Sequence, residues 1–288
     1  MAPLWLVSRI GSIVTSRHNA PLNGRVPCYP DRRSALRAGA AAAAGVLATA
    51  CGAGGAHPSA APASAAPAKA APARPPRRPA AAPRRFAGQP EEIAHGPRTR
   101  PEVALTFHGN GDPATARAVL AEAERAGARV TVLAVGTWLD AHPAMAARIL
   151  DGGHELGNHT QRHLALNDLP EAEAYAEITG CAQRLRRLTG SIGTWFRPSQ
   201  TQHATPLVRT LARRAGYPHV LSYDVDSLDF TSPGAAAVIR TVTGTIRSGS
   251  VVSLHFGYAD TVDAMPPLLE ELARRKLRAV TTTELLTP

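Results

Sequence analysis

From residue 101 onward, short apolar runs alternate with longer segments whose apolar residues recur at helical spacing. The first runs, 103–107 and 130–135, are predicted as buried strands. Asp112 and Pro113 predict a helix start between them, because Asp is a favoured N-cap and Pro fits the first helical position. Further apolar runs lie near 155–158, 194–196, 220–224, 251–254 and 278–281. Repeated βα units predict an α/β fold with a parallel sheet under outer helices, and their number favours a barrel.

The N-terminal region has the features of an export signal. Arg32 and Arg33 precede an apolar run at 38–50, which is too short to span a bilayer and ends in small residues before Cys51. This pattern resembles a bacterial twin-arginine signal followed by a lipoprotein cleavage box. Residues 1–51 are therefore predicted to be a signal region, and the product an exported membrane lipoprotein anchored through Cys51. A secreted form is the alternative.

Residues 52–100 consist mostly of Ala, Pro and Arg and have few large apolar side chains. Such a segment buries too little surface to offset its ordering entropy, so it is predicted to be a disordered linker before a domain at 101–288. Its arginines are expected to contact anionic envelope polymers or lipid head groups. Alternatively, they only keep the linker soluble.

The charge distribution argues against a nucleic-acid partner. The formal net charge is +10, but residues 1–100 hold 14 of the 32 Lys and Arg and only 3 of the 22 Asp and Glu. The folded region is thus close to neutral and lacks the basic excess of a DNA- or RNA-binding domain. The three cysteines are far apart in the sequence, so neither a disulfide framework nor a thiolate zinc site is expected.

Polar residues follow several predicted strands. His108, His159 and His255 come at the ends of three of them, and Arg197 and Asp229 lie at or just beyond the ends of two others. In a parallel barrel the carboxyl ends of the strands meet on one face, where active sites form. These side chains are therefore predicted to share one pocket.

His159 and His163 form a His-x-x-x-His pair just after a predicted strand. One helical turn would place positions i and i+4 on the same face, close enough for both imidazoles to hold one divalent cation such as zinc. The pair is a predicted metal site.

Together these segments resemble the polysaccharide deacetylase domain of carbohydrate esterase family 4, also called the NodB-homology domain. The resemblance covers residues 101–286, and its five motifs appear in order. They are Val103-Ala104-Leu105-Thr106-Phe107, Gly153-His154-Glu155-Leu156-Gly157-Asn158-His159-Thr160-Gln161-Arg162-His163, Phe196-Arg197-Pro198, Asp226-Ser227-Leu228-Asp229-Phe230 and Ser253-Leu254-His255.

The resemblance implies a distorted (β/α) barrel and a metal-dependent hydrolase that removes N- or O-linked acetyl groups from a polysaccharide. The resemblance also assigns roles to single residues. His159 and His163 would be metal ligands, His255 the general acid, Arg197 the residue that orients the base, Asp229 the residue that tunes His255, and Leu254 and Phe230 substrate-binding residues. Without the resemblance, Arg197 and Asp229 are also compatible with an ordinary buried ion pair.

Motif one departs from the family pattern Thr-Phe-Asp-Asp-Gly. His108 and Gly109 stand where the family has its base and its metal-binding aspartate. In one interpretation His108 is a third imidazole ligand and Asp112 a supporting or basic carboxylate. In a second, Asp112 is the third ligand and His108, with an ordinary pKa of about 6.5, is the base. In a third, the domain is a catalytically degenerate glycan-binding domain. Asp112 can also be only an N-cap.

Overall fold

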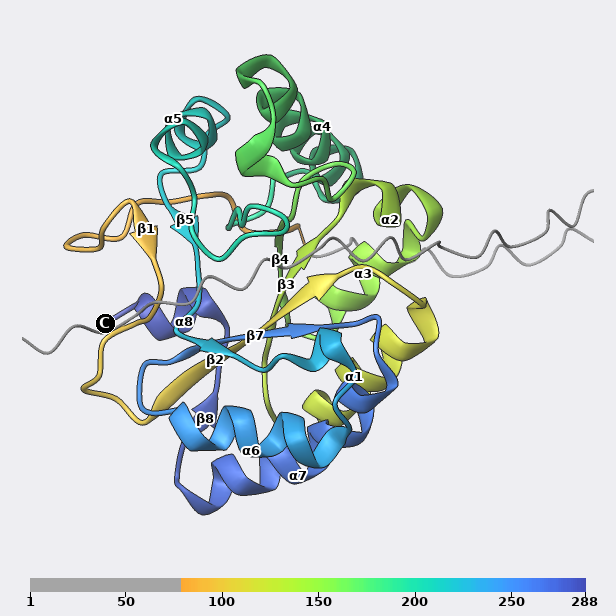
Figure 1. Ribbon diagram of the computed structural model, residues 1–288, viewed down its shortest axis with the longest axis vertical. Coiled ribbons are helices and arrows are strands. Elements are labelled where there is room, and N and C mark those ends of the chain that lie inside the picture. The colour runs from red at the N-terminus through yellow and green to blue at the C-terminus, as the bar shows by residue number, and fades with distance from the viewer. Residues whose placement is uncertain (1–78) are drawn as a thin grey trace, which may run out of the picture. The chain divides into compact units, whose positions relative to one another are not determined.

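The computed structural model describes residues 79–288 (Figure 1). The predicted signal region 1–51, with Cys51, and residues 52–78 of the predicted linker lie outside the described residues. No helix in the described part is long and apolar enough to cross a membrane.

The central sheet is parallel throughout. Its strands are β2 (Glu102–Gly109), β3 (Thr131–Ala134), β4 (Glu155–Asn158), β6 (Val225–Asp226), β7 (Val251–His255) and β8 (Arg278–Ala279). Their order is β4-β3-β2-β7-β6, and β8 pairs with the start of β2. β2 lies between β3 and β7 at the centre of the sheet, so all eight of its residues are buried.

Two short strands extend this sheet toward closure. Phe196 bridges Asn158 at the end of β4 and Val220 at the start of β5 (Val220–Leu221), and β5 pairs with β1 (Glu92–Ile93). Only residues 222–224 separate β5 from β6, so this stretch of chain connects the two ends of the strand order. The sheet is thus a distorted barrel, as predicted.

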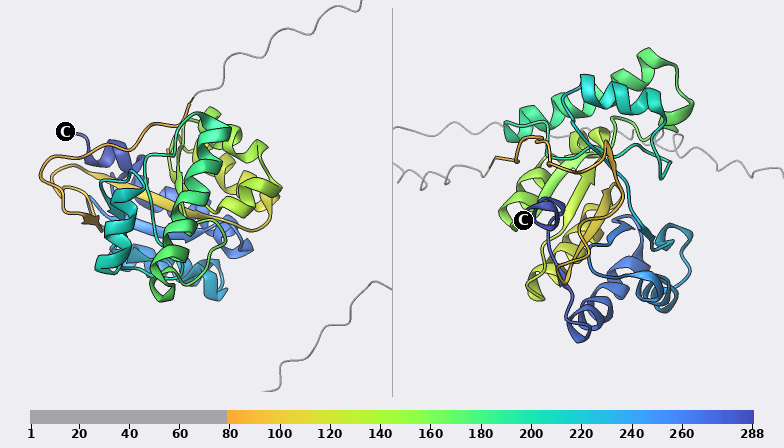
Figure 2. Two further views of the ribbon diagram at one scale, coloured as in Figure 1. Left: turned by 90° about the horizontal axis from the view of Figure 1, so that it is seen from above. Right: turned by 90° about the vertical axis from the view of Figure 1, so that its left-hand side faces the viewer.

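Helices cover the outside of the sheet. They are α1 (Pro113–Arg125), α2 (Gly136–Ala141), α3 (Ala144–Asp151), α4 (Glu171–Thr189), α5 (Pro206–Arg214), α6 (Ala235–Thr245), α7 (Ala259–Arg274) and α8 (Thr282–Leu286), with 3₁₀ helices at Leu166–Asp168 and Asp229–Thr231. Figures 1 and 2 show α4 and α5 on one side of the barrel and α6 and α7 on the other. As predicted, Pro113 begins α1 and the Asp112 carboxylate accepts from the Ala114 amide at 2.8 Å.

The predicted linker boundary at residue 100 is wrong for the described residues. Phe86 is buried and its ring stacks on Trp195 with centroids 5.2 Å apart, while Ile93 in β1 is fully buried. These isolated apolar side chains pack against the barrel, although the sequence around them has the composition of a linker. Residues 86–100 therefore belong to the folded domain.

Arginines in this segment also bind the domain itself. Arg98 forms an ion pair with Asp224 at 2.8 Å, and Arg100 donates to the carbonyls of Glu284 and Leu285. The Arg84 guanidinium lies over the Phe86 ring, 4.6 Å from its centroid. These three arginines of the predicted linker therefore contact the folded domain itself.

Candidate metal and catalytic site

Four histidines converge at the carboxyl ends of the central strands, as predicted. His108 and His255 are paired neighbours at the ends of β2 and β7, and their ring centroids are 4.2 Å apart. The His159 ring lies 4.3 Å from His108 and 4.9 Å from His163. One ring nitrogen each of His108, His159 and His163 lies within 4.8 Å of the other two. The three imidazoles can therefore hold one cation between them.

His159 and His163 meet by a different local geometry from the predicted helical turn. The segment that joins them is a loop, in which Thr160 and His163 have left-handed φ values of 67° and 60°. The Asn158 side chain accepts from the Thr160 amide at 2.8 Å, and Glu177 on α4 accepts from the Arg162 amide at 2.7 Å. These bonds compensate for the backbone strain.

His159 is arranged as a metal ligand would be. It is fully buried, and its Nδ1 lies 3.0 Å from the carbonyl oxygen of Arg197, so Nδ1 carries the hydrogen. Its Nε2 is buried without a hydrogen-bond partner among the described residues. Burial holds the pKa of His159 well below its ordinary value, so the ring is neutral at neutral pH. A neutral imidazole with a free lone pair fits a divalent cation.

His108 completes this group, whereas Asp112 does not join it. Burial lowers the pKa of His108 well below its ordinary value, and the charges of neighbouring histidines add to the shift. His108 Nε2 lies 3.3 Å from the hydroxyl oxygen of Ser253. Asp112 is exposed and caps α1. The placement of Asp112 fits the N-cap interpretation.

His255 and Asp229 form a tightly bonded pair. The two carboxylate oxygens of Asp229 lie 2.7 Å from His255 Nδ1 and 2.8 Å from its backbone nitrogen, and the Thr261 hydroxyl donates to Asp229 at 2.6 Å. Asp229 is fully buried, while the His255 side chain is 19% exposed. The pair fixes the ring so that Nε2 is left for other partners.

Arg197 is fully buried and does not pair with Asp229. It donates to the carbonyls of Leu221 at 3.0 Å and Ser222 at 2.9 Å, and its guanidinium lies 5.2 Å from the centre of the Tyr223 ring. Burial lowers its pKa to about 10, so it stays charged at neutral pH. Its Nη1 has no partner among the described residues. The alternative of an Arg197–Asp229 ion pair is therefore wrong.

A pocket of about 440 Å³ opens beside these histidines. Phe230, predicted to bind substrate, lines it and places its ring 5.5 Å from His255 in an edge-on arrangement. Several lining residues were not predicted: Gln200, Thr201, Gln202, Tyr223, Asp226 and Tyr258. Most of these residues lie on loops, where the sequence shows no local pattern. Asp226 is the first residue of motif four, so the motif could have indicated it.

Leu254 does not line the pocket, contrary to the prediction. Residues alternate between the two faces of β7, and Val252, Leu254 and Phe256 all pack in the core beneath the helices. Ser253 and His255 take the opposite face and lie toward the histidines.

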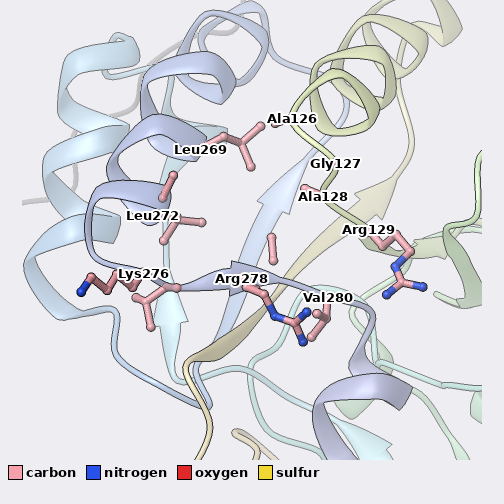
Figure 3. Close-up of a pocket in the computed structure, with 12 residues that line it drawn as sticks. Ala126, Gly127, Ala128, Arg129, Leu269, Leu272, Lys276, Arg278 and Val280 are labelled. Carbon is pink, nitrogen blue, oxygen red and sulfur yellow. The ribbon is translucent and has the colours of Figure 1, made fainter.

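A second hollow of about 470 Å³ lies away from the histidines, where α1 and α7 end near β8 (Figure 3). Leu269, Leu272 and Val280 line it, with Arg129, Lys276 and Arg278 also among its residues. Arg129 and Arg278 form ion pairs with Glu284 and Glu102. The lining of this second hollow holds neither a histidine nor a carboxylate, so the catalytic candidates remain in the pocket beside the histidines.

Comparisons with known proteins agree with this geometry. Residues 95–220 match the family model described as polysaccharide deacetylase. A peptidoglycan-N-acetylglucosamine deacetylase of Bacillus cereus is 30% identical over 194 residues, which cover 66% of this chain and 90% of that protein. A chitooligosaccharide deacetylase of Bradyrhizobium sp. is 29% identical over 165 residues, covering 54% of this chain and 71% of that protein.

Two kinds of solved structure share the fold. A crystal structure of a peptidoglycan N-acetylglucosamine deacetylase with 4-naphthalen-1-yl-N-oxidanyl-benzamide has a TM-score of 0.63 and 25% identity, covering 68% of this chain and 92% of that chain. A family 4 pseudoenzyme from Bacillus anthracis has a TM-score of 0.65 and 21% identity, covering 69% of this chain and 70% of that chain.

Proposed function

The chain belongs to the polysaccharide deacetylase family, and on that premise we propose that it is a metal-dependent hydrolase that removes acetyl groups from an envelope or extracellular polysaccharide. The observation that carries the proposal is the group of three imidazoles beside the Asp229–His255 pair. Altered motif-one residues thus coexist with a potential cation site and a candidate proton donor.

We propose that the metal is zinc and that His108, His159 and His163 hold it. Three neutral imidazoles suit zinc better than magnesium or calcium, which prefer oxygen ligands. Two observations support this assignment: His159 Nδ1 is hydrogen-bonded, and its Nε2 has no partner within residues 79–288. When bound, the ion would polarise the acyl carbonyl and lower the pKa of a water molecule.

His255 is the proposed general acid. Asp229 accepts from its Nδ1 and backbone amide, so the carboxylate both orients the ring and stabilises its protonated form. The exposed part of His255 lines the pocket and can give a proton to the departing sugar nitrogen or oxygen.

The proposed substrate is an acetylated amino-sugar polymer. The similar proteins include deacetylases of peptidoglycan N-acetylglucosamine and of chitooligosaccharides, which makes these two glycans the first to test. In this chain the exposed Phe230 offers an aromatic face for a sugar ring. The amide nitrogens of Gln200 and Gln202 donate to backbone carbonyls, and their amide oxygens are offered to sugar hydroxyl groups.

A second function is a catalytically inactive glycan-binding domain. It is favoured by the replacement of both motif-one aspartates, and structures of the same fold include a pseudoenzyme. Such a domain would use the pocket and its aromatic residues without acetate release.

Acetate release from zinc-reconstituted protein separates the two functions. Chito-oligosaccharide and peptidoglycan would be incubated with wild type and with His255→Ala, and acetate and free amines would be measured. An enzyme should release acetate, and the variant should lose roughly 100-fold or more in rate. Glycan binding without acetate release from any acetylated substrate would support the binding domain instead.

We further propose that the domain is exported and anchored through acylated Cys51, with secretion as the alternative. The proposal rests on the paired arginines and the apolar run before Cys51. Wild type should fractionate with membranes and Cys51→Ala should not. Equal release of both into the aqueous phase would contradict anchoring.

A further inference from the structure

Hydrolysis at this site needs a group that takes a proton from the attacking water, and His108 and Gly109 replace the two motif-one aspartates. We propose that Asp226 is this general base. The inference rests on the proposed function and adds a catalytic residue to it. Among the described residues that line the pocket with His108, His163 and His255, Asp226 is the sole carboxylate.

The barrel places Asp226 on the same inner face as the histidines. Asp226 ends β6 and pairs in register with Ser253 on β7, whose hydroxyl lies 3.3 Å from His108 Nε2. The preceding residue, Val225, packs in the core beneath the helices. Because side chains alternate along a strand, Asp226 points into the pocket.

Other carboxylates near the site are already engaged. Asp229 accepts three hydrogen bonds, two from His255 and one from Thr261, and is fully buried. Asp112 is exposed and caps α1. Asp226, in contrast, is half-buried, and its Oδ1 accepts from the Leu228 amide at 3.1 Å. The Tyr223 side chain also acts on this carboxylate, and both residues line the pocket that a water molecule would enter.

Asp226 interacts with two neighbouring side chains, the phenol of Tyr223 and the guanidinium of Arg197. Burial raises the pKa of Tyr223 and the charge of Asp226 adds to that shift, so the tyrosine hydroxyl keeps its proton beside the carboxylate. The charge of Asp226 also acts on the buried guanidinium of Arg197, opposing the effect of burial on the pKa of Arg197. A hydroxyl and a cation thus act on the carboxylate that is proposed to take the proton.

In the proposed reaction, one water molecule cleaves the acyl bond, and Asp226 and His255 move the protons. Water loses one proton to Asp226 as its oxygen bonds to the acyl carbon. The carbon–nitrogen bond then breaks, its electron pair goes to nitrogen, and protonated His255 gives that nitrogen its proton. Acetic acid and the amine leave, and the proton on Asp226 returns through solvent to His255. For an O-acetyl group, oxygen replaces nitrogen in the same sequence.

Asp226→Asn separates proton transfer from structure. The amide oxygen of Asn can still accept from the Leu228 amide, so the turn after β6 should persist. The expected result is a fall in kcat of roughly 100-fold or more, with KM within about threefold and zinc content unchanged. Asp112→Asn is the matched control and should keep wild-type turnover, because Asn also caps helices well.

A second variant tests the chemistry directly. Asp226→Ala removes the base, and added formate should restore turnover by at least about tenfold if a carboxylate is what the site lacks. A zinc-loaded Asp226→Asn with wild-type kcat, a change in KM alone, or an absence of formate rescue would overturn the assignment while wild-type turnover upholds the proposed function. A zinc-loaded wild type without any turnover would overturn both.

Discussion

Zinc should stabilise the folded protein through the three imidazoles, and the size of the effect can be estimated. A ligand that binds only the folded state at about 100 times its Kd adds roughly 2.7 kcal/mol to the free energy of unfolding. For a domain of this size each kcal/mol raises Tm by about 2–4 °C. Zinc at that concentration should therefore raise the Tm of wild type by roughly 5–11 °C.

Removing one ligand should nearly abolish this shift. Loss of a residue that only supports a ligand weakens metal binding by about 10–100-fold, so loss of a ligand itself should cost at least about 100-fold. At the same zinc concentration, the remaining stabilisation is about 0.4 kcal/mol, or roughly 1–2 °C. His163→Ala and His108→Ala should both show this small shift. The assay is differential scanning calorimetry of each variant with zinc and after chelation.

The comparison of each variant with and without zinc removes the effect of the substitution on the apo-protein. Asp112→Asn should keep the full shift, because Asp112 is exposed and caps α1. His142→Ala is a second control, since His142 follows α2 and lies outside the cluster. A full shift in His108→Ala, together with a lost shift in an Asp112 variant, would refute the three-imidazole site.

Two further predictions concern the general acid and the N-terminal segment. Asp229→Asn should lower kcat by roughly 10²–10⁴-fold, because the amide cannot stabilise protonated His255 as the carboxylate does. The zinc-induced Tm shift of this variant should stay. A wild-type kcat would contradict the role of Asp229. Phe86→Ala should lower the free energy of unfolding by about 3 kcal/mol in urea titrations, because the ring is buried on Trp195. Leu207→Ala, at a side chain that is 40% exposed, is the control and should cost under about 1 kcal/mol. Equal losses would contradict the packing of residues 86–100.

The sequence predicted the barrel and the convergence of its histidines because both follow from local periodicity and one topological rule. Apolar strands separated by helices require parallel pairing, and parallel pairing brings the strand ends to one face. His108, His159 and His255 could therefore be placed together from positions far apart in the chain. The structure confirms their proximity.

Errors arose where long-range contacts override local pattern. Phe86 and Ile93 are isolated apolar residues whose partners, such as Trp195, lie far along the chain, so composition alone suggested a linker. Leu254 took its substrate-binding role from the family resemblance, but the alternation of side chains along β7 places it in the core. The spacing of His159 and His163 equally fits a helix and the observed loop.

The energetics of the site favour a cation-binding role over a passive glycan surface. A buried polar atom without a partner costs about 1–3 kcal/mol. Among the described residues His159 Nε2 is such an atom, and His159 lies beside the imidazoles of His108 and His163. A surface that only binds sugar gains nothing from this arrangement, whereas a bound cation would satisfy the lone pair and recover the cost. Gly109 stands where the family has its anionic oxygen ligand, and His108 would supply a neutral nitrogen ligand instead, which would leave more positive charge on a bound ion and its water. With such an ion, water activation would need a carboxylate elsewhere in the pocket to accept the proton, and Asp226 lines that pocket.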